Sequence, residues 1–237
     1  MHSAIHATDF RHRTRIFNNP LHFFPAGSTQ RCGSRSVRRS LPAAFFLVPS
    51  PHATIRTMTQ RFTTSQWVPF PVGLVFAFFA DPANLPRLMP ANLRTRIEGA
   101  SIEPAPLRPA SSDRLSGPRG IAAGKGSEIV ISFRPVPLTP FRVRWTAQIA
   151  EFQWNDHFCD EQVCGPFAAF RHCHRTQAQT RNGVAGTLVT DEIAFKMPLG
   201  FLGNGAGFFV RRKLAGSFAH RQEQLIALLQ AASYPTL

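Results

Sequence analysis

The sequence predicts an α+β fold in which a curved antiparallel sheet wraps around one long C-terminal helix, with two short helices after the first strand. Apolar and polar residues alternate along short segments between residues 127 and 198, which is typical of strands that bury one face. From about residue 207 to residue 230, apolar side chains four or seven positions apart mark one face of an amphipathic helix. One helix covers such a sheet without filling its concavity, so we expect a cavity between them.

The composition is that of a globular protein and bears on two classes of partner. The chain has 237 residues, of which 43% are hydrophobic and 22 are Phe, enough for the core of one large domain. The net charge is +14, but no Lys/Arg stripe interleaved with aromatic residues occurs after residue 57, so we expect no nucleic-acid partner. No run of about 18 apolar residues occurs, and we expect no transmembrane segment.

Residues 1–57 differ from the rest of the chain. They hold eight arginines and one acidic residue, and they show no helical or strand periodicity. We interpret them as a disordered or spurious extension, with Met58 as the true start of a single domain at 58–237. The alternatives are an organelle transit peptide and a twin-arginine export signal at Arg38-Arg39. Because four cysteines are too few for a disulfide framework, we otherwise expect a cytoplasmic protein.

Before residue 127 the sequence predicts a strand, two short helices and a second strand. Asp81 followed by Pro82 predicts a helix start, because Asp caps the first backbone N–H groups and Pro fits the first helical position. The stretch 103–120 is rich in Pro, Ser and Gly, and we expect a loop of unusual length there. The expected ranges are 61–70 and 93–102 for the strands and 72–81 and 82–90 for the helices.

Five further strands and the long helix complete the predicted fold. Val143 and Trp145 alternate with Arg142 and Arg144, which places the two pairs on opposite faces of a strand. A Gly-Pro pair at 165–166 is a turn signal, so the segments on either side of it are expected to form a hairpin. The expected strands are 127–133, 141–152, 157–164, 168–179 and 186–198, and a Gly-rich turn at 200–207 is expected to lead into the helix.

This order of elements, together with three stretches of sequence, resembles the START-like (SRPBCC) superfamily. Its helix-grip fold occurs in birch-pollen allergens and in polyketide cyclase/dehydrase-like proteins, which include bacterial ligand-binding members. The similar stretches contain a strand with paired short helices, a hairpin, and a last strand that leads into a helix with the pattern Phe218, Arg221, Leu225. They are 67–90, 160–174 and 186–203, whereas 1–57 and 103–120 depart from a compact member of the family.

The resemblance implies a hydrophobic cavity for a lipid, a quinone, a polyketide or a similar ligand, and it implies no cofactor. It does not imply one activity, because members include enzymes, carriers and binding modules. Our first hypothesis is a non-enzymatic protein that binds a hydrophobic small molecule between sheet and helix. The alternatives are a cyclase/dehydratase-type enzyme that uses a cavity histidine, and a protein-interaction module with no ligand.

The candidate ligand-binding residues are those expected to face the cavity. The apolar candidates from the strands share the inward phase of the alternation, and two more come from the helix. His172 and His174 share one face of their strand, and on an inner face they are the polar groups best able to meet a ligand. The candidates are Ile131, Phe133, Val143, Trp145, His172, His174, Phe209 and Leu214.

The stretch HFCDEQVCGPFAAFRHCH, residues 157–174, also allows a metal interpretation. It holds three of the four cysteines and three of the nine histidines. If its Gly-Pro pair forms a two-residue loop, His157 lies opposite His174 and Cys159 opposite His172, a set of zinc-ligand type. A slightly longer loop scatters the set, and the spacing lacks the CxxC pairs of strong zinc signatures. We therefore expect ordinary alternation and no metal.

For catalysis, the candidates are His172 or His174 as acid or base, with Asp160 or Glu161 as partner. Adjacent strand residues face opposite sides, so only one of the two carboxylates shares the face of the histidines. We favour a structural hydrogen bond over a catalytic role for these groups.

The cysteines of the same stretch are expected to be small buried hydrophobic residues, because no electropositive, accessible environment for a nucleophile is indicated. A disulfide between Cys159 and Cys173 fits adjacent strands but is disfavoured by the expected reducing compartment.

Overall fold

The computed structural model describes residues 59–109, 120–136, 139–198 and 200–233. Within these ranges, seven antiparallel strands form one sheet, and a long helix follows the last strand, which confirms the predicted fold class. The strands, in the sheet order β1-β7-β6-β5-β4-β3-β2, are β1 (Gln60–Val68), β2 (Arg96–Ser101), β3 (Glu128–Phe133), β4 (Val143–Gln153), β5 (His157–Cys164), β6 (Ala169–Arg181) and β7 (Val184–Lys196). The helices are α1 (Val72–Ala80), α2 (Leu85–Leu88) and α3 (Gly200–Ser233), with 3-10 turns at Pro82–Asn84 and Ala91–Leu93.

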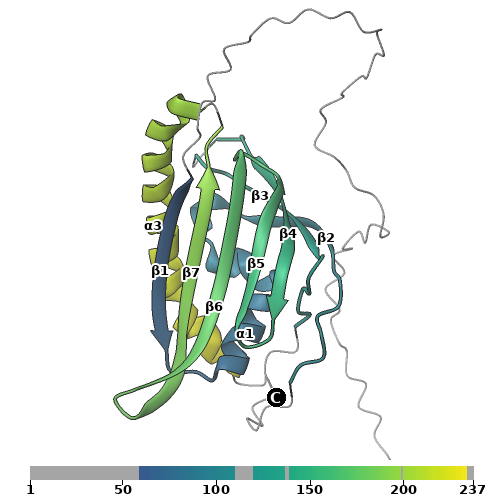
Figure 1. Cartoon of the computed structure of the whole chain (residues 1–237), viewed down its shortest axis with the longest axis vertical. Helices are drawn as coiled ribbons and strands as arrows, with labels where there is room; N and C mark the ends of the chain where they lie inside the picture. Colours follow the sequence, from purple (N-terminus) through teal and green to yellow (C-terminus); the bar gives the residue numbers. More distant parts are fainter. Residues whose placement is uncertain (1–58, 110–119, 137–138, 199, 234–237) are drawn as a thin grey trace, which may run out of the picture.

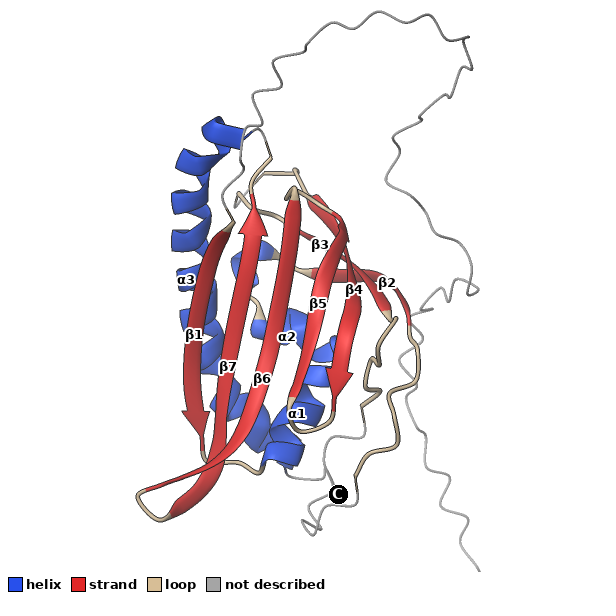
Figure 2. Cartoon of the chain, viewed as in Figure 1, coloured by secondary structure: helices blue, strands red, loops and turns tan. Residues whose placement is uncertain are grey.

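The labelled helices lie on one face of the sheet, which we call the inner face (Figures 1 and 2). The outer face of the sheet is turned toward the viewer in both figures. None of the helices in the described ranges is long and apolar enough to cross a membrane. The predicted extension 1–57 and residues 110–119 of the predicted loop lie outside the described residues.

The short helices begin where the sequence predicts them but are less regular. The Asp81 carboxylate accepts a hydrogen bond from the Ala83 N–H at 2.9 Å, which confirms the predicted helix start. The predicted helix 82–90 is divided into a 3-10 turn and the four residues of α2, since Pro86 has no N–H to continue a regular ladder.

Helix α3 begins at Gly200, so the predicted turn at 200–207 is wrong. A glycine inside a helix costs only about 1 kcal/mol relative to alanine, which does not terminate a helix that is well packed elsewhere. The helix has 34 residues and is therefore about 51 Å long at 1.5 Å per residue.

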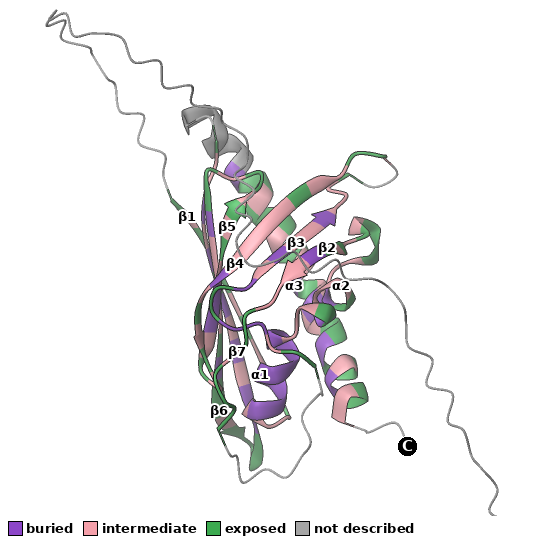
Figure 3. Cartoon of the chain, turned by 90° about the vertical axis from the view of Figure 1, so that its right-hand side faces the viewer, coloured by how far each residue is buried: buried purple, intermediate pink, exposed green. Residues whose placement is uncertain are grey.

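Two apolar clusters lie between the inner face and the helices. The larger one is built around α1, which is buried along almost its whole length because it contacts both the sheet and α3 (Figure 3). Leu225 and Leu229 of α3 belong to this cluster and are 1% and 0% exposed. The smaller cluster joins Phe170, Ile193 and Phe195 of the sheet to Phe218 of α3.

The register of the hairpin β5–β6 differs by one residue from the predicted one. Cys159 pairs with Cys173, and Asp160 pairs with His172. The connection is longer than two residues, because the Gln162 side chain bonds the backbone N–H and C=O of Phe167 at 3.2 and 2.8 Å and the strand resumes only at residue 169. A one-residue slip moves side chains to the opposite face.

The metal interpretation based on the shorter loop is therefore wrong. His157 and Cys159 lie on the outer face, whereas His172 and His174 lie on the inner face.

Candidate functional site

Four polar side chains of the hairpin and its neighbour β7 gather on the inner face. Asp160 on β5 lies opposite His172 on β6, and His174 lies opposite Asp191 on β7. Arg221 reaches the same place from α3, with its Nη2 3.2 Å from the Asp191 Oδ1. We call Asp160, His172, His174, Asp191 and Arg221 the inner cluster. Its side chains are between 6% and 18% exposed, so the cluster is nearly but not fully removed from solvent.

Asp191 is the centre of the inner cluster. Its Oδ1 lies 2.6 Å from Nδ1 of His174 and 3.2 Å from Nε2 of His172, besides the contact with Arg221. These distances allow three donors to share one carboxylate, with His172 and His174 each presenting an N–H to it. Asp160 is held more loosely, because its Oδ1 is 3.7 Å from Nδ1 of His172, beyond the length of a hydrogen bond.

Burial and neighbouring charges shift the pKa values of the two carboxyl groups in opposite directions. Burial acts to raise the pKa of Asp191, but the charge of Arg221 and hydrogen bonds from both histidines hold that pKa well below its usual range. Burial raises the pKa of Asp160, and the nearby His172 only partly offsets this. The cluster thus combines an ionised carboxylate with a carboxyl group that retains its proton more readily.

His174 is a neutral member of the cluster. Burial, followed by the charge of His172, lowers the pKa of His174 to about 3. Its ring is stacked on Phe79 at a centroid distance of 5.7 Å and packs against Phe158 at 4.5 Å. The Arg221 guanidinium lies 4.4 Å above the Phe79 ring. These aromatic contacts remove water from the cluster and strengthen the interactions between its charges.

Glu161 is not part of this cluster. It lies on the outer face, where its carboxylate bonds the Arg171 guanidinium, and Arg171 also meets Glu151 at 2.8 Å. Of the two carboxylates offered by the sequence, Asp160 is therefore the one that shares a face with the histidines. The assignment of Glu161 as an acid/base candidate is wrong for this reason.

The apolar candidates from the strands lie on the inner face. Ile131 pairs with Trp145 and Phe133 pairs with Val143, and all four are half-buried. The Trp145 Nε1 is shielded from solvent but has no hydrogen-bond partner, which is unusual for a buried indole N–H.

The two helix candidates differ from each other. Leu214 packs against the smaller apolar cluster, as expected for a residue that faces the sheet. Phe209 is 60% exposed and lies under the Lys213 ammonium at 5.4 Å, so it does not face the sheet. The prediction for Phe209 fails because the longer helix presents it on the outward side.

The structure joins Cys159 to Cys173 by a disulfide on the outer face. The preference for unbonded cysteines at these positions is therefore wrong, and neither sulfur of the disulfide is available as a nucleophile. The register explains the bond, since the two residues are direct cross-strand partners with a Cα–Cα distance of 4.0 Å.

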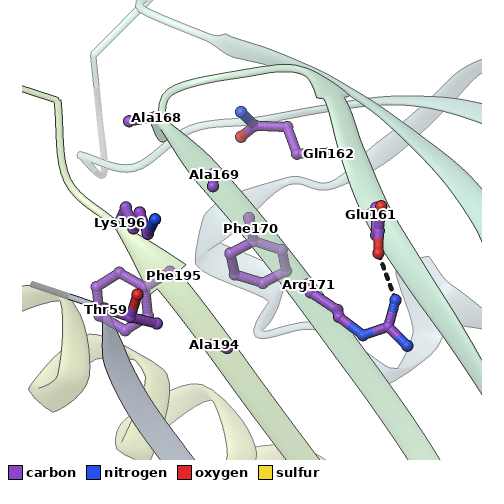
Figure 4. Close-up of a pocket in the computed structure, with 10 residues that line it drawn as sticks. All are labelled: Thr59, Glu161, Gln162, Ala168, Ala169, Phe170, Arg171, Ala194, Phe195 and Lys196. Atoms are coloured by element: carbon purple, nitrogen blue, oxygen red, sulfur yellow. Dashed lines mark hydrogen bonds and ion pairs between the residues drawn. The ribbon is translucent and has the colours of Figure 1, made fainter. Parts of the chain in front are cut away.

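A shallow pocket of about 330 Å³ lies at the end of β5, β6 and β7 where these strands approach Thr59 (Figure 4). Small side chains form its floor, and the Arg171–Glu161 pair lies along one side. Because Ala169, Arg171 and Ala194 belong to the outer phase of the strands, this pocket is separate from the inner cluster.

Asp191, the centre of the site, and Arg221 are not among the site residues predicted from the sequence. Asp191 occupies the apolar phase of its strand between Val189 and Ile193, which are 2% and 3% exposed. Arg221 lies three residues after Phe218 and four before Leu225, on the apolar face of the helix. An acidic residue at an inward-facing strand position and a basic residue on the apolar face of a helix that packs against that strand together indicate a buried ion pair.

No protein-family model matches the sequence, and no curated protein does. Solved structures with a similar fold include norcoclaurine synthase from Thalictrum flavum in complex with dopamine and hydroxybenzaldehyde, with a TM-score of 0.47 and 10% identity over 79% of this chain and 98% of that one. Ginseng major latex-like protein 151 from Panax ginseng has a TM-score of 0.47 and 12% identity over 75% and 99% of the two chains. The protein TTHA0849 from Thermus thermophilus has a TM-score of 0.48 and 12% identity over 74% and 100%.

The order and arrangement of the elements define the fold. A strand, short helices, six further antiparallel strands and a long C-terminal helix on the inner face of the sheet are the helix-grip fold of START-like (SRPBCC) proteins. The resemblance seen in the sequence is thereby confirmed at the level of the fold.

Proposed function

We propose that this protein binds a hydrophobic small molecule, such as a lipid, a quinone or a polyketide-like compound, between the inner face of the sheet and α3. The observation that carries this proposal is the inner cluster, a compact set of charged and titratable groups within an aromatic and aliphatic surface. Binding sites for small molecules are mostly apolar, with a few placed polar groups that fix the orientation of the ligand.

Two polar groups on this face are left with unused hydrogen-bonding capacity. Asp160 is 18% exposed and lies 3.7 Å from the nearest nitrogen of His172. The Trp145 N–H has no partner in the described structure. A hydroxyl group of a ligand would donate to Asp160, and a carbonyl group would accept from Trp145. We therefore expect a largely apolar ligand with at least one oxygen.

Native mass spectrometry of protein from a heterologous host tests the proposal directly. We expect a small apolar molecule to co-purify, and after its removal we expect fatty acids or quinones to quench the tryptophan fluorescence on titration. Asp160→Leu, which removes the acceptor, is expected to weaken binding of an oxygen-containing ligand by up to about tenfold, since one hydrogen bond contributes about 0.5–1.5 kcal/mol.

Glu161→Gln is the matched control, because Glu161 is the next residue but faces outward. The Glu161→Gln variant should bind the small molecule with the same affinity as the unmodified protein. His172→Ala separates a ligand contact from a structural role, since a lower melting temperature with unchanged affinity indicates structure alone. Absence of any bound molecule and of any quenching would contradict the proposal.

One observation favours a second candidate, an enzyme of the cyclase/dehydratase type. Asp160 is a carboxyl group with a raised pKa next to His172, and a general acid of this kind requires such a group near a partner. If the protein is an enzyme, Asp160→Asn should abolish turnover while ligand binding persists, and the rate should depend on pH. If many polyketide-like compounds bind but none is turned over, the protein is a binding protein and not an enzyme of this type.

A further inference from the structure

We propose that the outer face of the sheet holds a zinc site that forms when the Cys159–Cys173 disulfide is reduced. Its ligands are the Sγ atoms of Cys159 and Cys173, Nε2 of His157 and Oε2 of Glu151, which we call the outer site. It lies on the opposite face from the proposed ligand site and does not depend on it.

The register of three neighbouring strands brings these residues together. Glu151 on β4 pairs with Cys159 on β5, which pairs with Cys173 on β6, and His157 is two positions from Cys159 on the same face. Figure 1 shows β4, β5 and β6 side by side with the outer face of the sheet toward the viewer. Glu151 is 48% and His157 is 19% exposed, so these two ligands meet solvent, whereas Cys159 and Cys173 are buried beneath them at 0% and 7%.

Two of the distances between the proposed ligands already match those of a tetrahedral zinc site. With Zn–N and Zn–O bonds of about 2.0–2.1 Å and Zn–S bonds of about 2.3 Å, the nitrogen–oxygen edge of the tetrahedron is about 3.3 Å and the oxygen–sulfur edge about 3.6 Å. Oε2 of Glu151 lies 3.5 Å from Nε2 of His157 and 3.5 Å from Sγ of Cys159. Glu151, His157 and Cys159 already have their ligand atoms within 4.8 Å of one another, whereas Cys173 is not in that group. Once the disulfide opens, the Cys173 Sγ must move to about 3.8 Å from the Cys159 Sγ and toward the other two ligands to complete the set.

Neighbouring side chains orient two of the four ligands. The other ring nitrogen of His157, Nδ1, lies 3.1 Å from Oδ2 of Asp156. This carboxylate–histidine arrangement holds the tautomer that presents Nε2 to a metal. The other oxygen of Glu151, Oε1, meets the Arg171 guanidinium at 2.8 Å, which leaves Oε2 directed toward the thiol positions.

The disulfide controls whether the site can form. Disulfide sulfurs carry no charge and are poor ligands, whereas thiolates are strong zinc ligands. A dithiol reductant breaks the S–S bond by thiol–disulfide exchange, transferring two electrons and two protons to the cysteines while its own two thiols become a disulfide. Zinc then displaces the two thiol protons as it binds. Two sulfurs with one imidazole favour zinc over magnesium or calcium, which prefer oxygen ligands.

The experiment is a zinc titration of the full chain in its oxidised and reduced forms against a chromophoric chelator. We expect one zinc ion per reduced chain and an affinity at least about 100-fold lower in the oxidised form. Cobalt, bound in place of zinc, should give thiolate-to-metal charge-transfer bands and the intense visible bands of a tetrahedral site. Equal affinity in both forms, or no binding after reduction, would overturn the proposal.

Variants locate the site. Cys173→Ser and His157→Ala should each lose zinc affinity by at least about tenfold, and His157→Ala keeps the proposal testable if the cysteine variant does not fold. Asp156→Asn should weaken zinc binding by about tenfold, because it removes only the orienting carboxylate. Asp160→Asn is the control for the inner cluster and should bind zinc as the unmodified protein does. Loss of zinc in Asp160→Asn would place the metal in the inner cluster and refute the outer site.

Discussion

At the scale of single residues, Asp191 is the group on which the inner cluster depends. One of its oxygens accepts from two histidines and forms an ion pair with Arg221, which also lies 3.2 Å from Nδ1 of His174, and all of these groups are nearly removed from water. A buried charge is stable only with such compensation, because desolvation of an isolated carboxylate or guanidinium costs several kcal/mol. Removing the negative charge therefore leaves Arg221 buried without its counter-ion.

We predict that Asp191→Asn lowers the free energy of unfolding by about 3–5 kcal/mol, measured by urea denaturation. Glu192→Gln is the matched control at the next position. Glu192 is half exposed and lies 3.6 Å from Arg175, so its loss should cost less than about 1 kcal/mol. Similar losses in both variants would show that Asp191 is not held in a buried network.

The lowered pKa of His174 makes the free energy of unfolding depend on pH. Its pKa is about 3 in the folded protein, below the usual 6.5, so the unfolded chain binds the proton more readily. The stability that neutral His174 contributes is thus fully present above pH 6.5 and is lost as the pH falls toward 3. Asp191 acts in the same direction, but only below its usual pKa near 3.8.

We expect His174→Gln to reduce the slope of unfolding free energy against pH between 6.5 and 4 by up to about 1.4 kcal/mol per pH unit. The raised pKa of Asp160 acts with the opposite sign, but it is present in both proteins and cancels in the comparison. Denaturant titrations at several pH values measure the slope. An unchanged slope would mean that His174 is protonated in the folded state.

At the scale of elements, the strands could be predicted from the sequence, but their pairing could not. Alternation of apolar and polar residues identifies a strand locally, as it does for Val143 and Trp145. The register of β5 and β6 depends instead on the Gln162 side chain and its bonds to the backbone of Phe167, a contact that no periodicity reveals. Successive side chains of a strand point to opposite faces of the sheet, so this one contact decides which of His157, Cys159 and His172 share a face.

Two glycines test the packing of the last strand and the last helix. A Cβ on Gly186 of β7 would lie 2.5 Å from the Trp67 ring and 2.5 Å from the Val68 carbonyl oxygen, so Gly186→Ala should destabilise the protein by about 1–3 kcal/mol. A Cβ on Gly216 of α3 would meet nothing within 4 Å, and Gly216→Ala should stabilise the protein by about 0.5–1 kcal/mol. Thermal denaturation measures both, and opposite shifts are expected. A destabilising Gly216→Ala would contradict the exposed position of this residue.

At the scale of the whole molecule, α3 connects the two apolar clusters across the inner face. The order of elements and the amphipathic pattern were enough to predict this layer, because an apolar sheet face must be covered and the long helix has the apolar stripe to cover it. The start of the helix and the outward position of Phe209 were not predictable, since glycine content suggests a turn while tertiary packing decides otherwise. The predicted cavity and the role of residues 1–57 stay predictions.

The packing of α3 gives a matched pair of variants. Leu229 is fully buried in the larger cluster, so Leu229→Ala should lower the free energy of unfolding by about 2–5 kcal/mol. Ile226 is 38% exposed, and Ile226→Ala should cost less than about 1 kcal/mol. Urea denaturation of both variants checks the orientation of the helix. Equal costs would mean that α3 is rotated about its axis from the position described.

The connection between β5 and β6 also constrains how this protein can diverge. A single-codon insertion or deletion that shifted the ladder, and was not absorbed by the loop, would exchange the inward and outward residues of one strand, which would separate His172 from Asp160 and Cys173 from Cys159 together. A change of two codons would preserve both faces. Lineages that keep either chemistry should therefore vary this loop in steps of two residues, or absorb an odd residue as a bulge.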